Sequence, residues 1–307
     1  MGIIKAKTIM KVNNFLLLAF ANISFAIDCS FIPDYEMIHN GKKFDLATYG
    51  ALIGDQNFTR SQFGNLSYNE EAIGAYFNYY LTEKNALTFG AGYTRQYLGW
   101  SENPAFHQKN FDDFVFDISL TSFQLDSWRW IIDLGAHLNL NHFNPIKSAF
   151  YTQLLWGRYQ HLENLGIHIG FAGQAGIGKA KYLPLIGIDW YFLPRLSAVL
   201  VYPAEAALNY HVSNTWKLSL KYRSFAGWYH SYHRTGPDEP LPESIFTMES
   251  TGVDFGTYFD KENYRIYLYG GYNLGGWILI ENKNGDHGKY YHFNGSPYIA
   301  FKAGITF

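Results

Sequence analysis

The sequence predicts an all-β fold: a transmembrane antiparallel up-and-down β-barrel of about 14 strands, with 12 as the alternative. Three observations indicate this. Hydrophobic residues make up 48% of the chain and aromatic residues 19%, while only 16% is charged, and the apolar residues are interleaved with polar ones. From about Phe44 onward they alternate with period 2, which is typical of strands with one apolar face. Short and longer connections also alternate along the chain, as they do in up-and-down barrels.

The first 26 residues have the features of a secretory signal peptide. A start with three lysines is followed by a short apolar stretch, residues 15–25, and by the small residues Ser24 and Ala26 before the expected cut. Cleavage would leave a periplasmic N-terminal tail over residues 27–42 and a barrel domain over residues 43–307. The apolar stretch is too short for a retained membrane helix, and no later segment has the uninterrupted apolar length that such a helix needs.

Charge and cysteine content argue against several classes of function. The formal net charge is −2 at pH 7, and the expected cleavage removes three lysines and no acid. The mature chain is therefore mildly acidic and unsuited to non-specific nucleic-acid binding. Cys29 is the one cysteine, so no disulfide can form within the chain, and Asp28 before it argues against lipidation at this position. The sequence has no Walker-type, zinc-finger or dinucleotide motif, and we expect no cofactor.

The strands are expected where one face of the alternating pattern is apolar throughout. The clearest case is 128–141, where Trp130 and Leu134 lie on the apolar face and Asp133 and His137 on the polar face. The same split marks the segments 73–81, 87–94, 114–120, 216–223, 252–259, 265–268 and 299–307. No charge falls in the middle of the apolar faces, as a hydrocarbon-facing surface requires. The region 196–212 holds either two short strands or one loop, and this choice separates 14 strands from 12.

The connections fall into two classes that alternate along the chain. Short turns are expected at 82–85, 124–127, 162–164, 193–195, 213–214 and 260–263. Longer connections are expected at 55–69, 99–110, 142–147, 229–243 and 282–288. With an even number of strands, both ends of the barrel domain and all the short turns lie on the periplasmic side, and the longer connections lie outside.

The end of the chain resembles that of Gram-negative outer-membrane β-barrel proteins. Apolar residues occupy alternate positions before the terminal aromatic Phe307: they are Ile299, Phe301, Ala303 and Ile305. Together with the export signal and the strand pattern, this resemblance implies a location in the cell outer membrane, in contact with outer-membrane lipids and lipopolysaccharide. It also implies that Ile305 and Phe307 form the signal read by the barrel-assembly machinery. The resemblance is to the class as a whole, so it assigns no functional residues.

The polar faces place charged side chains of both signs inside the barrel. The predicted pore-lining residues are Asp117, Arg129, Asp133, His137, His168, Asp189, Lys217, Lys221, Arg223, Asp254, Arg265 and Lys302. Lys217, Lys221 and Arg223 follow one strand, a pattern that favours anionic solutes. The first hypothesis is therefore a porin-like channel for small polar or anionic solutes. The alternative for the same charges is an internal salt-bridge network that fills the barrel.

The string His211-Val212-Ser213-Asn214 gives a second hypothesis. A histidine and a serine two positions apart on one strand point the same way, so the imidazole could deprotonate the hydroxyl. The string resembles that of outer-membrane lipid hydrolases, which implies His211 as base, Ser213 as nucleophile and Asn214 as a supporting or oxyanion group. However, Ser-Asn is also an ordinary turn pair, and the predicted topology places it on the periplasmic side.

A third hypothesis is a non-conducting scaffold or adhesin whose connections 99–110 and 229–243 bind partners. The second of these contains His230 and His233, and the nearby acids are Asp238, Glu239 and Glu243. Such sets are common in solvated loops without a metal, and we predict none. Tryptophans near strand ends fit an interfacial girdle; they are Trp100, Trp128, Trp156, Trp190 and Trp277.

Overall fold

A computed structural model of the chain describes residues 42–307, except for gaps at 142–147, 177–179, 204, 233–242, 283 and 285. The predicted signal peptide and nearly all of the predicted tail lie outside the described residues, so both stay predictions. Among the described residues, no helix is long and apolar enough to cross a membrane.

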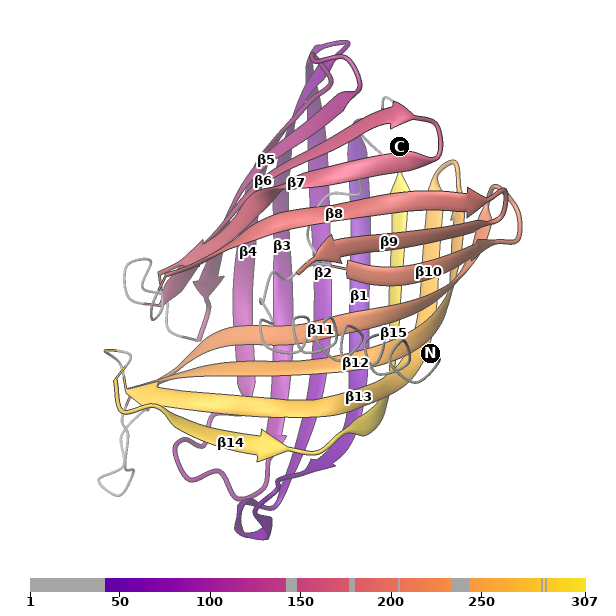
Figure 1. Ribbon diagram of the computed structural model, residues 1–307. Helices are drawn as coiled ribbons and strands as arrows, with labels where there is room; N and C mark the ends of the chain where they lie inside the picture. The colour runs from indigo at the N-terminus through magenta and orange to yellow at the C-terminus, as the bar shows by residue number, and fades with distance from the viewer. Residues whose placement is uncertain are drawn as a thin grey trace, which may run out of the picture.

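The described chain forms one sheet of antiparallel strands with a single 3-10 turn (Figure 1). The first eight strands are β1 (Phe44–Asn57), β2 (Asn65–Thr82), β3 (Asn85–Trp100), β4 (Asn110–Ser122), β5 (Trp128–Asn139), β6 (Ala149–Leu162), β7 (Leu165–Ala175) and β8 (Lys181–Leu193). The others are β9 (Leu196–Tyr202), β10 (Glu205–His211), β11 (Trp216–Tyr232), β12 (Glu243–Lys261), β13 (Tyr264–Asn282), β14 (Lys289–Phe293) and β15 (Ser296–Thr306). The 3-10 turn (Ser61–Phe63) lies between β1 and β2.

The sheet closes on itself. Strands β1 to β13 pair in chain order, and β15 pairs with both β13 and β1. β14 and β15 pair with successive parts of β13, at Gly276–Ile280 and Tyr264–Asn273, so together they fill one strand position. The result is a closed up-and-down barrel of 14 strand positions, which confirms the predicted fold class and strand number.

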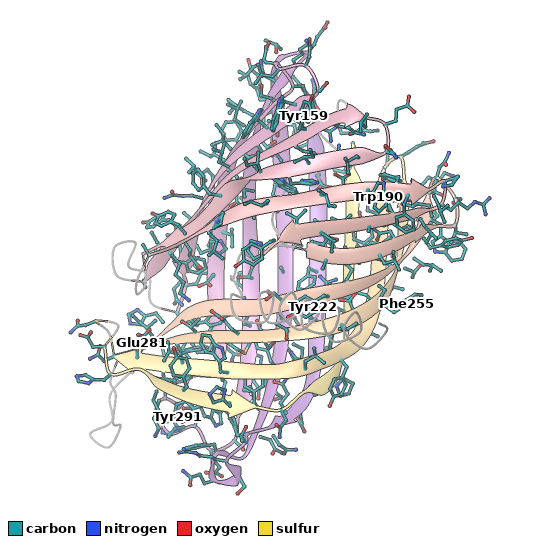
Figure 2. The ribbon with its side chains drawn as sticks, in the orientation of Figure 1. Tyr159, Trp190, Tyr222, Phe255, Glu281 and Tyr291 are labelled. Atoms are coloured by element: carbon teal, nitrogen blue, oxygen red, sulfur yellow. The ribbon has the colours of Figure 1, made fainter. Side chains whose placement is uncertain are left out.

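The outer face of the barrel is apolar and the inner face is polar or aromatic. Outward-facing Ile186 is 62% exposed and Phe255 is 58% exposed; both Trp190 and Phe255 project from the outside of the wall (Figure 2). Inward-facing neighbours such as Asp189 and Asp254 are buried. A continuous exposed apolar surface is unsuited to water and matches the hydrocarbon of a bilayer.

Two parts of the wall differ from the predicted pattern. The expected connection 55–69 is mostly strand, because β1 and β2 continue pairing past a bulge as far as Asn57 and Asn65. The polar residues in this segment led to the prediction of a loop. A strand that extends beyond the hydrocarbon layer of the membrane can, however, carry polar residues. The last strand is divided into β14 and β15 at Asn294 and Gly295, opposite a place where Gly275 of β13 has a φ of +97°.

Candidate functional site

All twelve predicted pore-lining residues lie at inward-facing positions of their strands. Asp117 and Asp133 are buried on the adjacent strands β4 and β5, and the His137 ring stacks on Phe150 of β6 at 4.1 Å between centroids. The strand pairing places these residues away from the basic residues on β11. The lumen therefore contains several separate polar groups in place of one continuous charged stripe.

The lumen is filled with aromatic side chains at the end that carries the longer connections. We call these residues the outer aromatic core: Phe58, Phe63, Trp100, Phe106, Phe111, Tyr229, Phe246 and Tyr291. The Phe58 ring lies 4.5 Å from that of Trp100, and the Phe246 ring lies 4.8 Å from those of Phe111 and Tyr229. Aromatic pairs at these distances add to the stabilisation that comes from burial alone.

The outer aromatic core joins strands on nearly opposite sides of the barrel. Phe111 lies on β4 and Phe246 on β12, which are six positions apart in a ring of 14. The hydroxyls of Tyr68 on β2 and Tyr229 on β11 are 3.2 Å apart. Because these side chains meet across the lumen, they close it at this level between β1–β4 and β11–β14.

Two expectations about the placement of side chains and connections were wrong. Trp100 and Trp156 are not girdle residues, because Trp100 is buried in the outer aromatic core and Trp156 bonds to His168 in the lumen. The connection 99–110 does not project as a free loop either, because its Phe106 stacks on Phe246 at 5.0 Å. Trp100 and Phe106 lie inside because the inner face of the wall is apolar at the outer end, whereas Trp156 lies inside because it belongs to a polar cluster with His168.

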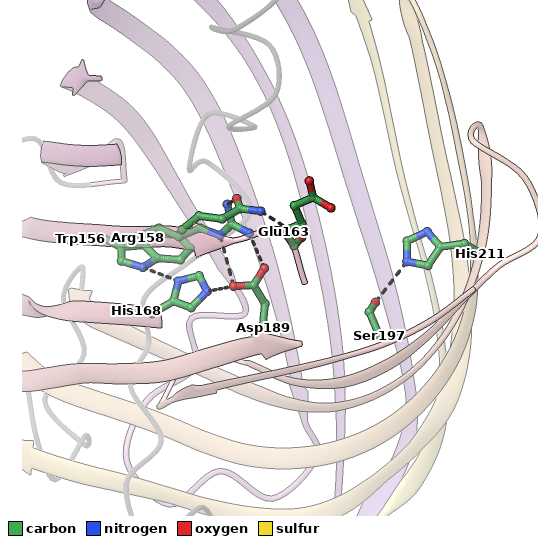
Figure 3. Close-up of polar contacts among 8 residues, drawn as sticks. Trp156, Arg158, Glu163, His168, Asp189, Ser197 and His211 are labelled. Carbon is green, nitrogen blue, oxygen red and sulfur yellow. Dashed lines mark hydrogen bonds and ion pairs between the residues drawn. The ribbon is translucent and has the colours of Figure 1, made fainter. Parts of the chain in front are cut away.

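A polar cluster on β6, β7 and β8 lies on the luminal side of the wall (Figure 3). Trp156 Nε1 donates to His168 Nδ1 at 3.0 Å, so the imidazole proton is on Nε2, which donates to Asp189 Oδ1 at 2.8 Å. Arg158 donates to both oxygens of Asp189. These bonds tie three strands together and use the hydrogen-bonding capacity of His168 and Asp189. Arg158 was not among the predicted pore-lining residues, although the alternating pattern, extended over 149–162, places it inward.

The basic stripe on β11 has acidic partners. Lys221 Nζ is 2.7 Å from Glu205 Oε1, and Arg223 Nε is 2.7 Å from Asp254 Oδ2. Lys217 and Lys221 each lie 4.9 Å from the ring of Tyr258. Lys221 and Arg223 are thus neutralised locally, which removes much of the basis for a preference for anions. Glu205 was missed because it belongs to the region that the sequence left open as strand or loop.

Asp254 and Arg265 link strands that are two positions apart at other points of the lumen. Tyr298 donates to Asp254 Oδ2 at 2.8 Å, beside the Arg223 contact. Arg265 pairs with Asp45 at 2.7 Å, and both side chains are buried. The remaining candidates also have inward positions: Arg129 lies over the ring of Phe123 at 5.1 Å, and Lys302 is half-buried on β15.

The His211 imidazole bonds to a different serine from the one expected. His211 Nε2 is 3.1 Å from Ser197 Oγ on β9 (Figure 3). Ser213 Oγ accepts hydrogen bonds from the backbone N–H groups of Thr215 and Trp216 at 3.3 and 3.1 Å, so it stabilises the turn before β11. Asn214 is exposed in the same turn. The structure therefore does not bring together the base and nucleophile of the lipid-hydrolase hypothesis.

No group of three or more His, Cys, Asp and Glu residues is placed to hold a metal ion within the described part of the chain. Of the residues considered for such a site, His230 is buried in β11 and Glu243 begins β12. His233, Asp238 and Glu239 lie outside the described residues.

A closed 14-strand barrel with an apolar exterior, short turns at one end and a charged lumen defines an outer-membrane β-barrel protein. No protein-family model matches the sequence. The chain is similar to an uncharacterised protein of Chlamydia trachomatis serovar D and to one of Chlamydia muridarum, with 21% identity over 207 and 209 residues. Each match covers 66% of this chain and 64% of the relative, so the chain aligns with less than two thirds of these relatives' length.

Several solved outer-membrane proteins have a similar architecture. An outer membrane channel from Pseudomonas putida F1 has a TM-score of 0.45 and 10% identity, covering 93% of this chain and 100% of that chain. The deltaS2 mutant of the monoaromatic hydrocarbon channel TodX, from Pseudomonas putida, has a TM-score of 0.45 and 11% identity, covering 91% and 92%. A Pseudomonas aeruginosa FadL homologue has a TM-score of 0.43 and 9% identity, covering 90% and 93%. The function of this chain therefore has to follow from its own lumen.

Proposed function

We propose that the protein is a passive outer-membrane channel for small polar solutes, closed at its outer end by the outer aromatic core. The observation that carries this proposal is the division of the lumen into two parts. Polar side chains line the part near the short turns, and aromatic side chains meet across the part near the longer connections.

Paired polar groups line the inner part. Thr88 donates to Asn78 at 2.6 Å, and Ser219 donates to Asn209 at 2.6 Å. The charges are also paired, as in Arg265–Asp45. A lining with balanced charges favours small polar solutes without strong selection by sign, which replaces the anion preference expected from the β11 stripe alone.

The two other hypotheses have less support. A lipid hydrolase would need Ser213 beside His211, whereas His211 bonds to Ser197, which is 2% exposed on the luminal side. A scaffold that presents the connection 99–110 would need that segment to be free, whereas Phe106 is buried in the outer aromatic core. The second proposed binding segment lies largely outside the described residues.

The proposal can be tested by the osmotic swelling of liposomes that contain the refolded mature protein. We expect slow uptake of neutral, anionic and cationic solutes of similar size by the wild type. Uptake should be much faster in a Phe111→Ala/Phe246→Ala variant, with little dependence on charge. If that variant is folded and still impermeable to all three solutes, the protein is not a solute channel.

A further inference from the structure

The wall of the barrel is discontinuous next to the β9–β10 hairpin. β8 pairs with β9 only between Ile186 and Leu193, and β11 pairs with β10 only between Lys217 and Tyr222. Beyond the hairpin, Lys181–Leu185 of β8 pairs only with β7, and Arg223–Tyr232 of β11 pairs only with β12, among the described strands. We call the boundary between these two segments the seam. In Figure 1, β9 and β10 stop part-way along the wall, while β8 and β11 continue.

The sequence favours an unpaired edge at this place. Pro184 lies in the unpaired segment of β8, and Pro203 lies at the tip of the hairpin. Proline has no N–H group to donate to a ladder, so in sheets it is confined to edges and strand ends. In lipid, however, an unpaired strand edge is costly, because no water is present to satisfy the backbone. The seam therefore requires some other kind of closure.

Side-chain contacts supply that closure. Lys181 Nζ on β8 is 3.4 Å from Glu249 Oε1 on β12, and Phe150 of β6 packs against Ile245 of β12. Lys181 faces the lumen, whereas Glu249 lies on the same face of β12 as lipid-facing Phe255. An inner-face side chain of one sheet edge thus meets an outer-face side chain of the other, so the two edges overlap.

Burial on β12 confirms the overlap. Among its outward-facing residues, Val253 and Phe255 are 39% and 58% exposed, but Ile245 and Thr247 are only 3% and 4% exposed. The outer part of β12 is therefore covered by protein where the rest of this face meets lipid. Such an overlap rests on side-chain contacts, which can separate without breaking any backbone ladder.

The seam has a balanced set of charges between its edges and along the lumen, and apolar residues on its lipid side. Three ion pairs lie along it: Lys181–Glu249, Lys221–Glu205 and Arg223–Asp254. On the outer face of β8, Tyr182 and Ile186 are 55% and 62% exposed. Equal numbers of cations and carboxylates suit a head group that carries both charges, and an apolar exterior suits a hydrocarbon chain.

The width of the seam limits the size of the hydrocarbon chain that can pass through it. At the tip of the hairpin, two strands separate β8 from β11, which is three strand spacings, or about 14 Å. Beyond the tip these two strands end, the two edges of the wall overlap, and Lys181 contacts Glu249 between them. A separation of these side chains would leave room for one hydrocarbon chain.

We propose that the seam is a lateral passage between the lumen and the outer leaflet for single-chain amphiphiles with a zwitterionic head group. The Lys181–Glu249 contact holds the passage closed. The passage would bypass the outer aromatic core, and it rests on the proposed function because the inner part of the lumen must be open to water. The polar head moves along the three ion pairs, and the hydrocarbon chain follows between the separated edges of the seam.

The experiment joins the two edges of the seam covalently. In a Cys29→Ser background, Lys181→Cys on β8 and Glu249→Cys on β12 place two thiols at the closing contact, where the wild-type side chains are 3.4 Å apart, and a bismaleimide with a spacer links them. The matched control is Ile118→Cys/Leu134→Cys, an outward pair in a continuous part of the wall. Proteoliposomes are loaded with NBD-labelled lysophosphatidylcholine, whose movement between leaflets is followed by dithionite quenching. Lipid transfer and ion conductance are both measured with these substitutions in the Phe111→Ala/Phe246→Ala background, in which the channel is expected to conduct.

We expect seam cross-linking to abolish transfer of the NBD-labelled lipid and to leave ion conductance unchanged, while the control link affects neither. A Lys181→Glu variant should increase transfer, and Lys181→Glu/Glu249→Lys should return it to the wild-type rate. Transfer that continues after seam cross-linking, or that falls only together with conductance, would overturn the lateral passage. In the Phe111→Ala/Phe246→Ala background, conductance without any lipid transfer would overturn the passage alone, and seam-dependent transfer without conductance would overturn the proposed solute channel alone.

Discussion

The charged residues of the lumen act as pairs. Asp45 and Arg265 are both buried, and Arg265 donates to Asp45 at 2.7 Å. Removing one partner of a buried pair leaves the other charge without compensation, and this is much more costly than replacing both. The sequence predicted the inward position of Arg265 from alternation, but it did not predict the partner, because Asp45 lies 220 residues away.

The Arg265→Gln substitution should therefore destabilise the barrel by about 3–5 kcal/mol. The double variant Asp45→Asn/Arg265→Gln should recover a large part of that loss, because no buried charge is left unpaired. Urea unfolding in lipid bilayers, followed by tryptophan fluorescence, measures both. Equal stabilities of the single and double variants would show that the pair is not coupled.

A second pair should control the sign of the charge that the opened channel prefers. Glu205→Gln leaves Lys221 without its acidic partner and should shift permeation toward anions, whereas Lys221→Gln should shift it toward cations. The reversal potential in a salt gradient, measured on the Phe111→Ala/Phe246→Ala background, gives the direction. Identical reversal potentials for the two substitutions would mean that this pair does not face the permeation path.

At the scale of elements, alternation predicted most strands and all the short turns. It works where one face meets lipid and the other meets water or polar groups, as on β5. It fails at the outer ends of β3 and β4, where the inner face is apolar and the outer face carries the Arg95–Asp112 ion pair, so the inward positions of Trp100 and Phe111 could not be predicted. The division of β14 from β15 was also missed, because it depends on the conformation of the neighbouring strand at Gly275.

Gly275 should be essential to that division. Its φ of +97° is strained for any residue with a side chain, and an added Cβ would lie 2.6 Å from the carbonyl oxygen of Phe293. Gly275→Ala should therefore destabilise the barrel by about 1–3 kcal/mol. Gly270→Ala on the same strand is the matched control, because the nearest atom to its added Cβ is 3.4 Å away. Urea titration of the two variants compares them, and equal stabilities would contradict this explanation.

For the whole molecule, the sequence predicted a closed barrel but could not predict whether its lumen is open. Closure of the sheet into a barrel follows from the local alternation of apolar and polar residues. The side chains that fill the lumen, in contrast, are held by contacts between residues far apart in the sequence. Tyr68 and Tyr229 are 161 residues apart, and Lys181 and Glu249 are 68 apart. The candidate site is similar in this respect: the predicted residues face inward, while the acid partner of Lys221 and the serine beside His211 came from the structure.

The central claim is that the outer aromatic core closes a channel, and single-channel conductance of the refolded mature protein in a planar bilayer tests it most directly. We expect little or no conductance from the wild type and steady ohmic steps from Phe111→Ala/Phe246→Ala. The control, Phe116→Ala/Phe255→Ala, changes outward residues of the same two strands and should behave like the wild type. Resistance to unfolding in sodium dodecyl sulfate confirms that each barrel is folded. Large ohmic steps from the wild type, or silence from the folded Phe111→Ala/Phe246→Ala barrel, would contradict the claim.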